Sequence, residues 1–76
     1  MQIENFINAY ISKLVAPGTL VAEHDSFFDY VDSFSFIDLI TNVESEFGLS
    51  MDLMSVDFDL SATIRRVLDW FNLHDS

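Results

Sequence analysis

The segment from Ser33 to Phe47 carries the strongest structural signal in this chain. Its apolar residues recur at the spacing of one face of an α-helix. Asp32 and Ser33 stand at its start, and both residue types are preferred as helix N-caps. Gly48 follows its end, where glycine commonly terminates a helix. The sequence therefore predicts a helix over residues 33–47 with a signal at each end.

The two faces of this predicted helix differ in composition. At 100° per residue, the face expected to meet the core is apolar and holds Phe36, Leu39, Ile40, Val43 and Phe47. The opposite face collects Phe34, Ile37, Asp38, Thr41, Glu44 and Ser45. Exposed apolar residues edged by carboxylates are typical of a docking patch. The alternative, in which Ile37 lies at the margin of the core and Phe34 folds back over the preceding loop, is equally open.

Two more segments have helical periodicity. The first has an apolar and aromatic face and is stopped by Pro17-Gly18; that face holds Ile3, Phe6, Ile7, Tyr10, Ile11, Leu14 and Val15. The face of the last segment holds Leu60, Ile64, Val67, Leu68 and Phe71. Ser61 is the expected N-cap of this last helix, with Asp59 and Thr63 as alternatives. One short helical turn is expected within residues 51–58.

Residues 16–31 form a long connection between the first two predicted helices. We expect Leu20, Val21, Phe27 and Phe28 to pack under the helices, because a loop this long in a small domain needs anchors. The predicted fold is all-α, a single domain over residues 1–76 with three main helices plus one short helix, together a small four-helix bundle.

The charge of the chain limits its partners. Thirteen acidic and three basic side chains give a formal net charge of −10. Nucleic acid and anionic membrane surfaces would repel this charge, so we expect neither as a partner and favour proteins with basic patches. The alternative is a charge that only keeps a small protein soluble. No apolar run approaches the ~18 residues of a membrane span, and the N-terminal residues lack the basic region of a signal peptide. We expect a cytoplasmic location.

The start of the predicted 33–47 helix is the candidate site for chemistry. Unpaired N–H groups and the positive end of the helix dipole would favour a phosphate ester on the Ser33 hydroxyl. The alternative is that Asp32-Ser33 is only an N-cap pair. No nucleophile elbow surrounds the serine, so we do not expect a hydrolase.

Metal sites are not expected. Ala62 and Leu68 occupy positions where a calcium loop beginning at residue 57 needs glycine and glutamate. His24 and His74 are isolated, and the chain has no cysteine, so a zinc site is not predicted. The acidic residues ahead of the 33–47 helix are expected to be solvated loop charges: Asp25, Asp29 and Asp32.

Asp32-Ser33-Phe34, followed by a helix that ends in Glu44-Ser45-Glu46-Phe47-Gly48, resembles the acyl carrier protein family. The family pattern is Asp-Ser-Leu or Asp-Ser-Met ahead of a helix ending in Glu-x-Glu-Phe-Gly. Phe27-Phe28-Asp29 is similar to the element that leads into the family's serine, and Asp69-Trp70 lies where Asp-Tyr is common in its last helix. The resemblance covers nearly the whole chain.

Three features depart from the family pattern. Tyr30-Val31 lead directly into Asp32, where the family usually has a glycine shortly before the Asp-Ser pair. Phe34 replaces the usual leucine or methionine, and Phe36 sits where a small or β-branched residue is common. These differences bear on the enzymes and cargo that the protein serves.

The resemblance implies that Ser33 carries a 4′-phosphopantetheine arm, which a phosphopantetheinyl transferase attaches from coenzyme A, and that Asp32 presents the serine to that enzyme. Ser35 lacks a preceding aspartate and is the weaker candidate. By the same resemblance the chain is a monomeric carrier rather than an enzyme. Its arm would hold an acyl or aminoacyl group as a thioester within a biosynthetic pathway. The residues expected to dock partner enzymes are Phe34, Ile37, Asp38 and Glu44.

The partners implied by the resemblance are a loading ligase and a downstream transferase or synthase. Phe36 and the other phenylalanines would fill the interior that a long fatty chain needs, which favours a short acyl or aminoacyl cargo, as in the D-alanyl carrier proteins with their Asp-Ser-Met. A carrier role in fatty-acid or polyketide synthesis is the alternative. An unmodified acidic helical domain that binds a basic partner, with Ser33 only an N-cap, is the alternative from another functional class.

Overall fold

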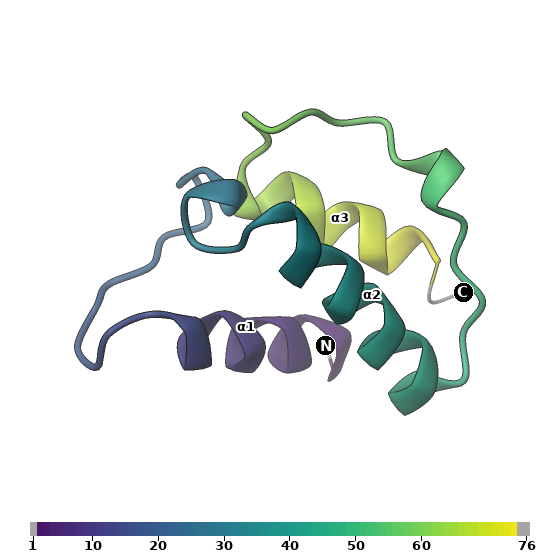
Figure 1. Cartoon of the computed structure of the whole chain (residues 1–76), viewed down its shortest axis with the longest axis horizontal. Helices are drawn as coiled ribbons and strands as arrows, with labels where there is room; N and C mark the ends of the chain where they lie inside the picture. The colour runs from purple at the N-terminus through teal and green to yellow at the C-terminus, as the bar shows by residue number, and fades with distance from the viewer. Residues whose placement is uncertain (1, 75–76) are drawn as a thin grey trace.

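The computed structural model describes residues 2–74, which form the helices α1 (Gln2–Leu14), α2 (Ser33–Phe47) and α3 (Ile64–Leu73). Helix α1 packs against both α2 and α3. Figure 1 shows the connection from α2 to α3 leaving the end of α2 and running along the outer side of α3 to its start. This all-α arrangement with three main helices confirms the predicted fold class.

Helix α1 turns a narrow apolar stripe inward. Its buried residues recur every fourth position and are Ile3, Ile7 and Ile11. Beyond the helix, the Thr19 amide donates to the Ala16 carbonyl at 3.1 Å and closes a turn. Gly18 has a φ of 86° there and follows Pro17, which is the residue pattern of a type II turn. The predicted stop at Pro17-Gly18 is therefore confirmed.

Helix α2 begins and ends at the predicted residues. At its start, an Asp32 carboxylate oxygen accepts a hydrogen bond from the Ser35 amide at 2.7 Å. At its end, Gly48 adopts the left-handed conformation, and the Leu49 amide donates to the Glu44 carbonyl at 3.1 Å. The predicted core face is buried apart from Phe47, which is half-buried and packs against the core.

Helix α3 starts later than the expected cap. Thr63 is its N-cap, and its hydroxyl oxygen accepts from the Arg66 amide at 3.2 Å. Ser61 instead donates its hydroxyl and its amide to Asp59, which forms a tight turn before the helix. Leu60 lies in that turn and is exposed, so its predicted place on the buried face is wrong. The buried residues of α3 are Ile64, Val67, Leu68, Trp70 and Phe71.

The expected fourth helix is a single 3₁₀ turn, η2 (Leu53–Ser55), so the described residues form a three-helix bundle and not a four-helix bundle. The Asp52 carboxylate accepts from the Met54 amide at 2.9 Å and starts the turn. Leu53 and Met54 are both exposed, so no buried apolar face extends the turn into a helix. The Trp70 indole donates to the Ser55 carbonyl at 3.2 Å and holds η2 against α3.

The connection before α2 is anchored differently from the prediction. Phe27, within a second 3₁₀ turn η1 (Phe27–Asp29), is fully buried, and Phe28 is half-buried. Leu20 is 93% exposed and Val21 is also exposed, so their expected packing under the helices is wrong. Backbone hydrogen bonds, and not these two side chains, hold the connection in place.

Three backbone hydrogen bonds join this connection to the start of α3. The Phe27 amide donates to the Ala62 carbonyl at 2.9 Å. The amides of Ile64 and Arg65 donate to the carbonyls of Asp25 and Glu23, each at 2.9 Å. Ser26 and Thr63 form an isolated antiparallel bridge between the same segments. The first amides of α3 are thereby satisfied, which fixes the connection without burying Leu20 or Val21.

Arg65 of α3 links its own helix to α1 and to the 16–31 connection through ion pairs. Its guanidinium pairs with Glu4 of α1 at 3.0 Å, with Glu23 at 3.1 Å and with Asp69 at 2.9 Å. The side-chain amide of Asn72 also donates to Glu4 at 2.7 Å. The hydrogen bond from Arg65, and after it the smaller effect of the bond from Asn72, holds the pKa of the Glu4 carboxyl below its ordinary value.

Candidate functional site

Ser33 is the first residue of α2, and its side chain is exposed. Among residues 2–74 no hydrogen bond engages its hydroxyl. Asp32, not Ser33, is the N-cap, so the interpretation of Ser33 as merely a capping serine is wrong. An exposed hydroxyl on the first turn of a helix is available to an enzyme and stands at the positive end of the helix dipole.

The Asp32 carboxylate is committed to the helix start. It accepts from the Ser35 amide at 2.7 Å, and hydrogen bonds from the Ser35 amide and hydroxyl lower the pKa of Asp32. A smaller contribution comes from the Phe34 amide. The charge of Asp32 therefore stabilises the turn that carries Ser33 while leaving the serine hydroxyl unbonded.

The first turns of α2 and α3 differ in what covers them. At α3 the amides of Ile64 and Arg65 are occupied by backbone carbonyls of the 16–31 connection, and the Arg66 amide by Thr63. At α2 the capping contact comes from Asp32 alone among the described residues, and Ser33 is exposed. The start of α2 is thus accessible where that of α3 is closed.

Tyr10 of α1 holds the first turns of α2 from the other side. Its hydroxyl lies 2.9 Å from an Asp38 carboxylate oxygen and 3.2 Å from the Ser35 carbonyl. Partial burial, followed by the bond to Asp38, raises the pKa of Tyr10. Because this contact bridges two helices next to Ser33, it fixes the orientation of the turn that presents the serine.

The apolar residues predicted for docking are exposed. Phe34, next to Ser33, is 86% exposed, and Ile37 is 48% exposed. The alternative in which Phe34 folds back over the loop is therefore wrong. Large apolar side chains left in water beside a candidate modification site are what a protein partner would cover.

The acidic residues predicted for docking have structural partners of their own. Asp38 is exposed but accepts from Tyr10 and, at 3.2 Å, from the Asn42 side chain. Glu44 is half-buried, and its carboxylate accepts from the Met51 amide at 2.9 Å, which holds the chain after α2. Glu44 also lies on the far half of α2 from Ser33. The structure therefore brings Phe34, Ile37 and Asp38 close to Ser33 along the helix, but not Glu44.

Ser33 lines a groove of about 400 Å³. Apart from Ser33 and Asp59 its lining is apolar: Phe28, Phe36, Ile37, Leu53, Val56, Phe58 and Leu60. The wall contributed by residues 53–60 is not expected from the sequence, because only one short helical turn is predicted there. The signal that could have indicated it is the alternation of apolar and acidic residues in Val56-Asp57-Phe58-Asp59-Leu60, whose three apolar members all line the groove.

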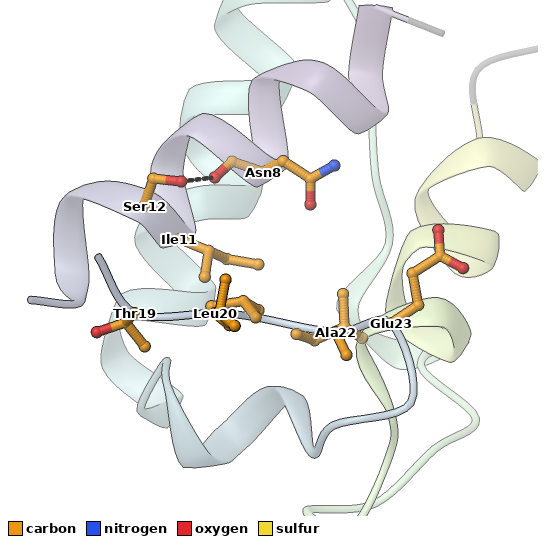
Figure 2. A pocket seen from close by; sticks show the side chains of 9 residues that line it. Asn8, Ile11, Ser12, Thr19, Leu20, Ala22 and Glu23 are labelled. Atoms are coloured by element: carbon orange, nitrogen blue, oxygen red, sulfur yellow. Dashed lines mark hydrogen bonds between the residues drawn. The ribbon is translucent and has the colours of Figure 1, made fainter. Parts of the chain in front are cut away.

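A second pocket, of about 330 Å³, lies between α1 and the 16–31 connection (Figure 2). Figure 2 shows the Ser12 hydroxyl bonded to the Asn8 carbonyl at 2.9 Å, so this polar group is already used within α1. Glu23 at its edge pairs with Arg65. Ser33 does not line this pocket, and the polar groups of Ser12 and Glu23 are engaged within the fold.

Catalytic and metal-binding arrangements are not found around Ser33. Within residues 2–74 no three histidine, cysteine or acidic side chains come together to hold a metal. Asp25 accepts from the Ala22 amide and the Tyr30 hydroxyl, and these bonds lower its pKa. His24 lies 3.8 Å from Asp25, and His74 contacts Trp70 and Ser55; neither histidine bonds to Ser33. In the same span, no helix has the length and apolarity to cross a membrane.

Comparison with known proteins identifies a family for this chain. A family model described as a phosphopantetheine attachment site matches residues 8–71, which include α2 and most of α1 and α3. No curated protein and no solved structure matches the chain. Domains of the matched family carry a covalently attached 4′-phosphopantetheine, are not themselves catalytic, and interact with phosphopantetheinyl transferases and partner enzymes. The chain therefore belongs to the phosphopantetheine-binding carrier family of acyl carrier proteins.

Proposed function

We propose that residues 1–76 form a single carrier domain that holds an acyl or aminoacyl group on a 4′-phosphopantetheine arm attached to Ser33. The observation that carries the proposal is the state of the Ser33 side chain. It is exposed on the first turn of α2, and within the described residues its hydroxyl has no hydrogen-bond partner. Ser35 is half-buried and engaged with Asp32, so it is the poorer attachment point.

The residues around Ser33 fit a phosphate ester. The first amides of α2 and its dipole favour an anion at this position, and Asp32 caps the turn without covering the hydroxyl. The apolar groove that Ser33 lines gives an attached arm a surface on which to lie. When bound, the arm supplies a thiol that forms a thioester with the carried group. Its flexible link keeps that group at a high effective concentration for enzymes docked on the domain.

The exposed apolar pair Phe34 and Ile37, with Asp38 beside them, is the proposed docking surface. Glu44 remains part of that prediction, although its bond to the Met51 amide leaves one of its oxygens committed. The net charge of −10 favours partners with basic patches. The proposed partners are a phosphopantetheinyl transferase, a ligase that loads the cargo, and a transferase or synthase that receives it. The cytoplasmic location expected from the sequence stays a prediction.

Intact mass after co-expression with a broad-specificity phosphopantetheinyl transferase tests the assignment. The wild-type chain and Ser35→Ala should both gain the mass of one arm, and Ser33→Ala should gain none. A Ser33→Ala protein that is still modified would place the arm elsewhere. A wild-type chain that stays unmodified would favour the unmodified interaction domain.

A further inference from the structure

Phe36 belongs to the lining of the groove beside Ser33. Phe36 lies three residues after Ser33, about one helical turn along α2, and lines the groove. Its side chain is 6% exposed, whereas Ile37, Leu53 and Leu60 in the same lining are exposed. The exposed residues therefore form the rim of the groove, and Phe36 forms part of its base.

Phe36 is held in place by other aromatic rings. The ring centroids of its neighbours lie 5.6 to 6.2 Å away, in edge-to-face or tilted geometry, and belong to Phe27, Phe28, Phe58, Trp70 and Phe71. These distances are typical of packed aromatic pairs. A ring packed by five others cannot move aside without displacing residues of α3 and of both connections. The interior behind Phe36 is therefore closed to anything that enters from Ser33.

The volume of the groove sets a second limit. Ligand sites in proteins span about 300–1,000 Å³, and this groove, at about 400 Å³, is near the lower end of that range. It is also open along its rim, where Ile37, Leu53 and Leu60 meet solvent. A group lying in such a groove stays in contact with water along this rim, so a longer chain is not enclosed by it.

We propose that Phe36 determines which cargo this carrier accommodates: it closes the base of the groove, so the carried group is compact and is not threaded between the helices. This inference rests on the proposed function. It predicts that the folded domain gains no stability from a longer acyl chain, because the added methylene groups find no apolar interior to enter. Removing the Phe36 ring opens that interior, and a long chain then refills the space.

The test compares wild type with Phe36→Ala and Phe36→Leu. Each chain is loaded at Ser33 by a broad-specificity phosphopantetheinyl transferase from coenzyme A analogues that carry an acetyl, a hexanoyl or a dodecanoyl group. The acyl group is joined through an amide, so that the link survives heating. Phe6→Ala is the matched control, because Phe6 packs edge-to-face on Phe47 at 5.6 Å and neither residue lines the groove.

Two measurements follow the series. The thermal midpoint of each loaded chain is compared with that of the same chain carrying the acetyl group. The fluorescence of Trp70, which lies 6.2 Å from Phe36 and is the only tryptophan of the chain, reports at constant temperature whether a chain enters the interior. In wild type and Phe6→Ala neither quantity should change with chain length. In Phe36→Ala the midpoint should rise by about 4 °C or more from acetyl to dodecanoyl, with a change in Trp70 emission.

Phe36→Leu keeps the proposal testable if the alanine variant does not fold. Leucine opens a smaller space than alanine does. We therefore expect the thermal midpoint to rise from acetyl to hexanoyl and to rise no further with dodecanoyl. A wild-type midpoint that climbs with chain length would overturn the proposal, as would Phe36 variants that show no length dependence. The same rise in Phe6→Ala would also overturn it, since any loosening of the core would then suffice. Failure of the proposed function has a separate signature, which is the absence of loading at Ser33.

Discussion

The Asp32 carboxylate bonds to the Ser35 amide at 2.7 Å, and this contact places Ser33 one residue inside α2 rather than at its cap. Capping and attachment are thereby divided between two adjacent residues. The same Asp-Ser pair can stabilise the helix and still present an unbonded hydroxyl.

This division predicts different effects for Ser33→Ala and Asp32→Ala. Ser33→Ala should change the free energy of unfolding by less than about 0.5 kcal/mol, because an exposed side chain without a hydrogen bond is removed. Asp32→Ala should lower the thermal midpoint by about 4 °C or more, because the cap of α2 is lost. Thermal melts of both variants check this. A larger loss in Ser33→Ala than in Asp32→Ala would contradict the assignment of the cap.

Arg65 should stabilise the fold more than Arg66 does. Arg65 pairs with three carboxylates from α1, the 16–31 connection and α3, whereas Arg66 pairs with Asp57 and lies over the Phe58 ring. Arg65→Ala should lower the free energy of unfolding by about 1 kcal/mol after allowance for solvent screening, and Arg66→Ala should lower it by less. Both variants change the net charge equally, so urea denaturation of the pair isolates the network. Equal losses would show that the charge change alone matters.

The lowered pKa of Glu4 gives this network a pH dependence. A carboxyl with a lower pKa in the folded than in the unfolded chain contributes stability above its ordinary value of 4.5. That contribution is lost as the pH falls through the folded-state value. The difference in free energy of unfolding between wild type and Arg65→Ala should therefore be largest above pH 4.5. It should become smaller as the pH falls below that value. Denaturation at stepped pH, with Glu4→Gln as the control that lacks the titrating group, measures the difference.

Phe34 should contribute to recognition without contributing to stability. It is 86% exposed beside Ser33, so Phe34→Ala should leave the thermal midpoint unchanged. Loading by a phosphopantetheinyl transferase should lose about fivefold or more in kcat/KM, as for an apolar anchor worth about 1 kcal/mol. Met54→Ala is the control, because Met54 is equally exposed but lies in η2. Equal loading of the Phe34 variant and wild type would remove Phe34 from the docking surface.

The acidic surface should make stability depend on salt. A net charge of −10 repels itself, and screening shortens the range of this repulsion to about 10 Å at 0.1 M salt. The thermal midpoint should rise from low to moderate sodium chloride. Magnesium chloride at equal ionic strength should add nothing, because the described residues form no cluster of three acidic side chains that could hold an ion. A flat midpoint, or a specific gain with magnesium, would contradict this account.

Helix α2 could be predicted from the sequence because both of its end signals are adjacent to its apolar pattern. Asp32 and Gly48 lie beside the residues that they cap, and the one competing signal, Ser33, shifts the predicted start by a single residue. The start of α3 was less well defined, since Asp59, Ser61 and Thr63 are all capping residue types. The choice of Thr63 depends on the Asp59 carboxylate, which takes both polar groups of Ser61.

The anchoring of the 16–31 connection and the groove could not be predicted in the same way. The connection is held by backbone hydrogen bonds. Every residue type supplies a carbonyl and every type except proline supplies an N–H, so no side-chain pattern marks it. The groove combines α2 with residues 53–60, whose placement follows from the Trp70 bond to Ser55 and from the contacts of Asp57 and Phe58 with α3. Such contacts depend on how the helices pack.

The backbone bonds between the connection and α3 join residues that are far apart in the chain. Glu23 and Arg65 are 42 residues apart, so their pairing closes a long loop and must overcome its entropy. Ribosomes make the chain from the N-terminus, and Ser33 is therefore synthesised well before the segment that secures the residues leading into Asp32. We expect nascent chains that lack α3 to be poor substrates for attachment of the arm. Completion of the last helix would then act as a checkpoint that keeps unfinished molecules out of the pathway.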